Sequence, residues 1–71
     1  MKITIAQQIK NARLEKGWTQ YELSKRIDVI PMSIYSWEAN KRIPGGKYIL
    51  KLQEVLGVMF SSPESNTDAD T

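Results

Sequence analysis

Apolar residues recur three or four positions apart in four stretches of the 71-residue sequence. That spacing is typical of helices with one buried face. It predicts one helix from about residue 4 or 5 to just before Gly17, and others over about 19–27, 31–38 and 47–56. The residues expected to face the core are Ile5, Ile9, Ala12, Trp18, Leu23, Ile27, Ile34, Trp37, Ile49, Leu52 and Leu56.

Local signals mark where these helices begin and end. Gly17 and Gly57 follow the first and fourth helices, at a position where glycine adopts positive φ without strain. Thr19 and Glu22 have the spacing of a capping box, in which each side chain accepts a hydrogen bond from the other residue's backbone N–H. The second helix is therefore expected to start directly after Thr19.

About three residues join the second and third predicted helices. Pro31 suits the first position of a helix and keeps Ile30 out of helical dihedrals. Asp28 tolerates the left-handed conformation that such a turn needs. So short a link forces a sharp turn between packed helices, which is the geometry of a helix-turn-helix.

Charge divides the chain into two parts. Up to Val58 there are ten basic and five acidic residues, a net charge of +5, and the rest of the chain carries −3. We expect one domain over residues 1–62 and a disordered acidic tail over 63–71. A basic domain of this size favours a polyanionic partner. The alternative is that the positive charge only keeps the protein surface soluble.

Several classes of site and segment are absent from the sequence. Without Cys or His there is no disulfide, Cys/His zinc site or haem ligation by His, so no cofactor and no metal are expected. No apolar run is long enough for a signal peptide or a membrane span, which predicts a cytoplasmic protein that does not enter membranes. Gly45-Gly46-Lys47 lacks the leading glycine and the following Ser or Thr of a phosphate loop, so we do not expect an enzyme.

The segment GWTQYELSKRIDVIPMSIYSWEANKRIP resembles the helix-turn-helix of the lambda repressor/Cro type, also called the XRE family. The resemblance extends over about residues 5–58. It implies an all-α, compact bundle of four to five helices. It also implies a regulator of transcription, expected to be a repressor, that binds double-stranded DNA, usually as a homodimer, with its third helix in the major groove.

The resemblance also assigns residues. A structural ion pair is implied between Arg13 and Glu38. Contacts to bases are implied for Ile30, Pro31, Met32, Ser33 and Ser36. Contacts to the DNA backbone are expected from Thr19, Gln20, Tyr35, Asn40, Lys41, Arg42 and Lys47. Candidates for the dimer interface are Val58, Met59 and Phe60, for which closure of the core is the alternative.

The sequence departs from the family's pattern where the third helix begins. A Ser or Thr is usual where Ile30 stands, so this helix lacks a good N-cap. Ile30 and Met32 have the chemistry to contact the C5-methyl of thymine in the major groove. The alternative for both residues is packing in the core, in the turn or at an interface.

A different class of function stays open. The same fold can serve as a protein-interaction module, such as an antitoxin that binds a toxin, with a partner at the C-terminal region. Binding to phosphates weakens steeply with salt, whereas a protein interface should depend on salt much less.

Overall fold

The computed structural model describes residues 4–60, which fold into four α-helices and contain no strand. In chain order they are α1 (Ile5–Glu15), α2 (Gln20–Ile27), α3 (Pro31–Glu38) and α4 (Gly46–Leu56). The predicted all-α class is confirmed, with four helices in the described part of the chain. The expected tail over 63–71 lies outside the described residues.

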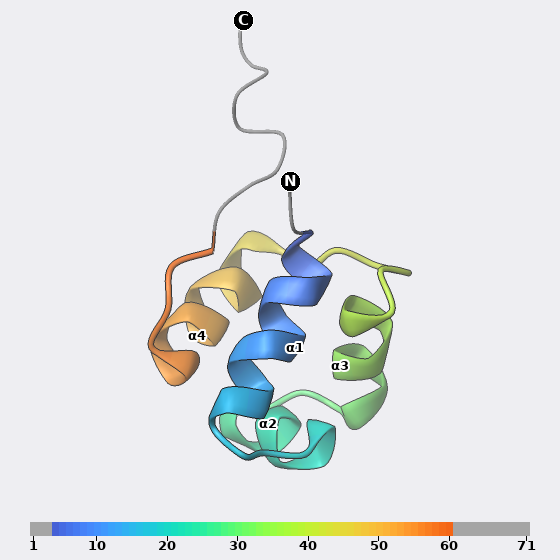
Figure 1. The fold of residues 1–71 in the computed structure, drawn as a ribbon. Coiled ribbons are helices and arrows are strands. Elements are labelled where there is room, and N and C mark those ends of the chain that lie inside the picture. Colours follow the sequence, from blue (N-terminus) through green and yellow to red (C-terminus); the bar gives the residue numbers. More distant parts are fainter. Residues whose placement is uncertain (1–3, 61–71) are drawn as a thin grey trace, which may run out of the picture.

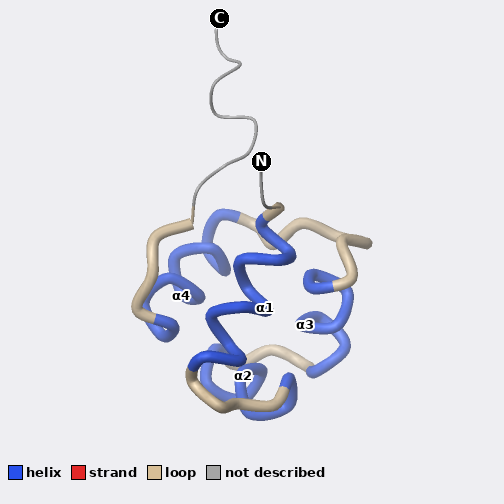
Figure 2. Tube along the Cα trace, in the orientation of Figure 1, coloured by secondary structure: helices blue, strands red, loops and turns tan. Residues whose placement is uncertain are grey.

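The helices form a small bundle around α1 (Figure 1). In this view α3 and α4 lie on opposite sides of α1, and α2 lies across the lower end. Both α3 and α4 contact α1 and α2, and loops connect all four helices (Figure 2). The core is built from the predicted stripes: Ile9, Ala12, Leu23, Ile27, Ile34, Trp37, Leu52 and Leu56.

Caps fix the helix ends as the sequence predicts. The Thr19 hydroxyl accepts from the Glu22 N–H at 3.0 Å, and the Glu22 carboxylate accepts from the Thr19 N–H at 2.8 Å, which completes the capping box. Asp28 ends α2 with φ 63°, and Gly57 ends α4 with φ 71°. These positive φ values let the chain turn sharply without adding a residue.

Three residues predicted in the core, Ile5, Trp18 and Ile49, lie at its edge. Trp18 is half-buried because it sits in the link between α1 and α2, where the Arg26 guanidinium lies 4.1 Å from its ring centroid. Ile49 is also half-buried, since Leu52 and Leu56 take the inward face of α4. Ser24 is buried instead, and its hydroxyl donates to the Tyr21 carbonyl at 2.6 Å, so this buried hydroxyl is satisfied.

The chain after α4 is not helical within the described residues. Val58 and Phe60 pack against the core, and the Phe60 N–H donates to the Gln53 side-chain oxygen at 3.0 Å. Met59, between them, is 82% exposed. Residues 58–60 form no further helical turn, and the Phe60 backbone bonds to a side chain of α4 instead.

Candidate functional site

The turn between α2 and α3 presents an apolar tip. The Val29 N–H donates to the Ser24 carbonyl at 3.0 Å, which closes α2. Ile30 then takes extended dihedrals, φ −75° and ψ 151°, and makes no side-chain cap. Its side chain is 66% exposed, so the alternative that it packs in the core or the turn is wrong.

One face of α3 is buried and the opposite face is open. Ile34 and Trp37 point into the core. Pro31, Met32 and Tyr35 are exposed, and Ser33 and Ser36 are half-buried beside them. The five residues expected to meet bases therefore lie on or beside one accessible surface at the start of α3.

A hollow of about 510 Å³ lies between this surface and the chain that follows α3. Its walls combine apolar and aromatic side chains, hydroxyl-bearing side chains and one arginine. They include Ile30, Met32, Ser33, Ser36, Arg42 and Ile43. No pattern in the sequence assigns Ile43 a role, because nothing along the chain shows that the loop returns beside α3.

The loop after α3 is held by backbone hydrogen bonds. Asn40 has φ 62°, and the N–H groups of Lys41 and Arg42 both donate to the Ser36 carbonyl, at 2.9 and 3.3 Å. This places the two basic side chains next to α3. The Lys41 ammonium lies 5.7 Å from the centroid of the Tyr35 ring, a cation–π contact on the protein surface.

The charge of this region is one-sided. Residues 39–53 include four basic residues and no acidic one. The carboxylate that comes before them, Glu38, has a side chain only 4% exposed. A polyanion approaching α3 and its loop therefore meets positive charge with no accessible carboxylate from these residues.

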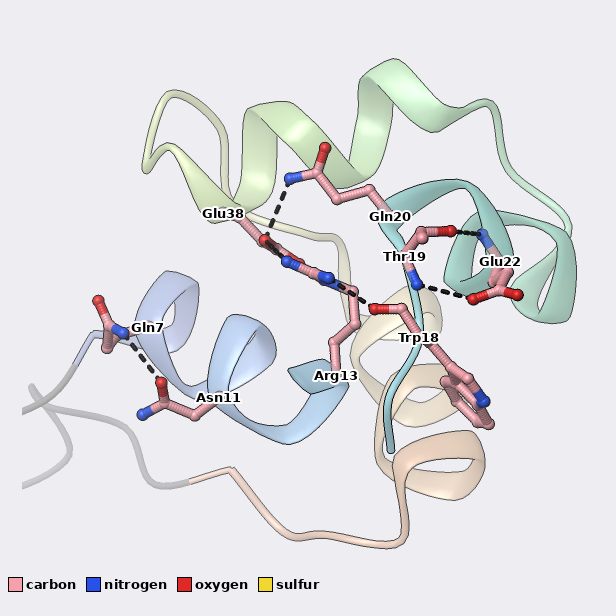
Figure 3. A network of polar contacts seen from close by, with 8 residues as sticks. All are labelled: Gln7, Asn11, Arg13, Trp18, Thr19, Gln20, Glu22 and Glu38. Atoms are coloured by element: carbon pink, nitrogen blue, oxygen red, sulfur yellow. Dashed lines mark hydrogen bonds and ion pairs between the residues drawn. The ribbon is translucent and has the colours of Figure 1, made fainter. Parts of the chain in front are cut away.

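Glu38 is the centre of a polar network that joins three helices (Figure 3). It accepts from Arg13 Nε at 2.7 Å and Arg13 Nη2 at 2.9 Å, a bidentate ion pair between α3 and α1. Arg13 Nη1 donates to the Trp18 carbonyl at 2.7 Å. Hydrogen bonding to Glu38 raises the pKa of the Arg13 guanidinium. Burial lowers this pKa, and the coulombic attraction of Glu38 raises it further. The guanidinium is therefore charged over the whole ordinary pH range.

Gln20 belongs to the same network. Its amide nitrogen donates to Glu38 at 3.1 Å, which ties the start of α2 to the end of α3. An amide nitrogen carries two hydrogens, so Gln20 keeps one donor beyond this bond. It lines a smaller hollow of about 240 Å³ together with Lys10, Tyr35, Glu38 and Ala39.

Lys10 is the residue of this second hollow that the sequence left without a role. It lies three residues before Arg13 on α1, so the two side chains share one helix face. The three-residue spacing from Arg13 is the feature of the sequence that could have indicated a role for Lys10. It indicates one only when Arg13 is known to contact Glu38.

The described residues offer neither a metal site nor a membrane span. Between residues 4 and 60 no group of three or more acidic, His or Cys side chains is placed to hold a metal ion. None of the described helices is long and apolar enough to cross a membrane.

Known proteins resemble this chain in sequence. The model of the helix-turn-helix family matches residues 9–60. Multiprotein-bridging factor 1 of Schizosaccharomyces pombe is 34% identical over 55 residues, covering 78% of this chain and 37% of the relative. Multiprotein-bridging factor 1 of Candida albicans is 36% identical over 56 residues, covering 79% and 37%. The chain thus spans little more than a third of the length of these relatives.

A solved structure has the same fold. The P22 c2 repressor protein, in complex with synthetic operator 9T, superposes with a TM-score of 0.77 at 25% sequence identity. The match covers 97% of this chain and 100% of that chain.

Proposed function

The chain belongs to the helix-turn-helix family of the lambda repressor type, and on this basis we propose that it is a DNA-binding regulator of transcription. It recognises specific sequences in double-stranded DNA and inserts α3 into the major groove. The observation that carries the proposal is the exposed face of α3, followed by residues 39–53, the next loop and most of α4, which include four basic residues and no acidic one. Likeness to a repressor solved on its operator supports a repressor, which acts by occupying its site.

Base contacts and backbone contacts come from different parts of the surface. The exposed start of α3 meets the bases, with apolar contacts to thymine methyl groups and hydroxyl contacts to base edges. Its residues are Ile30, Pro31, Met32, Ser33 and Ser36. The phosphates are held by Thr19, Gln20, Tyr35, Asn40, Lys41, Arg42 and Lys47.

Lys10 joins the group that holds phosphates. It shares a hollow with Gln20 and Tyr35, two residues already assigned to the DNA backbone. A phosphate there would meet an ammonium, an amide N–H and a phenol, all of which are donors. The carboxylate in the same hollow, Glu38, is already paired with Arg13.

The regulator acts as a homodimer, so that two copies of α3 reach half-sites about one helical turn apart. Leu50 is 66% exposed and Met59 82% exposed, and both line a hollow of about 690 Å³ at the end of α4. The dimer contact uses this hollow, which Val58 also lines, together with Phe60, which follows in the chain. Sedimentation of the full chain tests this, since Leu50→Lys should shift a dimer to monomers, whereas an unchanged mass would exclude this surface.

The names of the relatives favour a second candidate function. Several multiprotein-bridging factors match this domain, so the chain could serve as a module that binds other proteins. Such binding would use the exposed apolar residues near the end of α4 and would depend little on salt.

Selection of bound duplexes from a random DNA pool, at near-physiological salt, tests the leading proposal. We expect a palindrome with thymine-rich half-sites. Changing Lys41 and Arg42 together to Ala should weaken binding to all sequences. The log–log salt slope should fall by about 0.9 for each phosphate that the variant no longer touches.

Lys25→Ala is the matched control for this measurement. It removes one positive charge from α2, where the ammonium lies 5.3 Å from the Tyr21 ring centroid and away from the proposed contacts. It should leave the salt slope almost unchanged. If no duplex is enriched and the slope is near zero, DNA recognition is wrong and the protein-binding candidate takes its place.

A further inference from the structure

Ile43 is an exposed apolar residue without a structural reason for its position. Its side chain is 78% exposed in the loop between α3 and α4, and it is not part of the core cluster. A single exposed isoleucine is ordinary. Ile43, however, lines the same hollow as Ile30 and Met32, which are 66% and 61% exposed. Several large apolar side chains gathered at one exposed site indicate a binding surface.

The other groups in the hollow indicate what it binds. Ser33 and Ser36 add hydroxyls, and Arg42 adds a positive charge on the same side as Ile43. The nearby basic residues Lys41 and Lys47 are exposed, and residues 39–53 include no acidic residue. A cleft that combines exposed apolar side chains with hydroxyls and a positive charge suits a ligand that is polyanionic and also carries small apolar groups.

A DNA strand that contains thymine has both properties. Its phosphates are negative, and the C5-methyl of thymine is the apolar group that base pairs present in the major groove. A purely apolar protein segment would leave Arg42 without a counter-charge. The combination of walls therefore favours DNA over an apolar partner.

We propose that Ile43 is a residue that determines DNA sequence preference. With Ile30 and Met32 it forms a cleft, the thymine cleft, that receives the methyl group of a thymine while Arg42 contacts a phosphate of the same strand. The inference rests on the proposed function, and it adds that a residue outside the recognition helix reads a base.

Replacing thymine by deoxyuracil tests the cleft directly. This change removes the methyl group and keeps the base-pairing pattern. The probe is the duplex recovered by selection, labelled for fluorescence anisotropy, with each thymine replaced in turn at constant salt. For the natural protein we expect one replacement to weaken binding by about fourfold, the factor that burial of one CH₂ group gives.

Ile43→Ala should make the protein less sensitive to that replacement, because Ile30 and Met32 still line the cleft. The thymine duplex should bind more weakly than to the natural protein, by up to about fourfold, and the deoxyuridine duplex should lose less affinity. Leu14→Ala is the matched control, because Leu14 is an apolar side chain on α1 that is 55% exposed. This control should keep the ratio seen with the natural protein. Circular dichroism of both variants checks that they fold.

The outcomes separate the inference from the function on which it rests. If Ile43→Ala weakens both duplexes by the same factor, Ile43 makes a general contact and the inference is wrong, although DNA binding stands. If the natural protein binds both duplexes equally at every position, the thymine cleft does not exist. If selection enriches no duplex and binding does not depend on salt, the proposed function has failed as well.

Discussion

Replacing Glu38 with glutamine removes one charge from the network between α1, α2 and α3 while keeping the size of the side chain. The Glu38 side chain is 4% exposed and its partner Arg13 is 9% exposed, so water cannot take the place of the missing interactions. Three hydrogen bonds enter the carboxylate, two from Arg13 and one from Gln20. An amide has a single oxygen, so its NH₂ group must face a donor on one side.

The cost follows from this geometry. Removing one partner of a buried ion pair costs about 3–5 kcal/mol, because the remaining charge is left uncompensated. Glutamine keeps one acceptor for Arg13, so we expect the lower end, about 3 kcal/mol of unfolding free energy. For a domain of this size that corresponds to a fall in Tm of about 12–24 °C.

Thermal and urea unfolding followed by far-UV circular dichroism measure this change. Glu54→Gln is the matched control, because it makes the same substitution at an exposed carboxylate on α4 and should stay within about 0.5 kcal/mol. A Glu38→Gln protein with unchanged Tm would refute the reasoning.

A double-mutant cycle separates the pair from its parts. Arg13→Met and Glu38→Leu should each destabilise the domain strongly, yet the double variant should return to within about 2 kcal/mol of the natural protein. The remaining destabilisation comes from the Trp18 carbonyl, which no longer has the Arg13 donor, and from the Gln20 amide, which no longer has the Glu38 acceptor. Effects that simply add would show that the two residues do not act as a pair.

Three further substitutions test local features. Asp28→Gly should raise the free energy of unfolding in urea by about 1 kcal/mol. It relieves a residue with φ 63° and removes a negative charge from the C-terminus of α2. A lower free energy of unfolding would mean that the Asp28 side chain makes a stabilising contact. Thr19→Ala removes the capping box and should cost about 1 kcal/mol in the same assay, whereas no change would show that Glu22 caps α2 alone. Ile30→Ser supplies the missing N-cap of α3 and should raise stability by about 1 kcal/mol while weakening binding to thymine-containing duplexes; unchanged binding would remove Ile30 from the interface.

Features set by near neighbours in the chain were predictable from the sequence. The four helices, the capping box at Thr19 and the turn at Asp28 depend on residues within about four positions of one another. The ion pair between Arg13 and Glu38 spans 25 positions and entered through a family resemblance rather than through spacing.

Features that depend on how the helices pack were missed. Trp18 and Ile49 have core-like positions in sequence, yet neighbouring side chains leave them at the edge of the bundle. The structure was needed to show that Ile43 lies beside α3 and that Lys10 lies beside Gln20. Periodicity within one helix carries no information on which other segment lies across from it.

The bond between Gln20 and Glu38 joins the outer ends of α2 and α3, whereas the short turn joins their inner ends. The helix-turn-helix is thus a closed ring rather than an open hairpin. Neither helix can fray outward without breaking a contact to the other, so both belong to one cooperative unit of opening. Their backbone amides should exchange hydrogen with solvent at a common free energy, close to that of global unfolding.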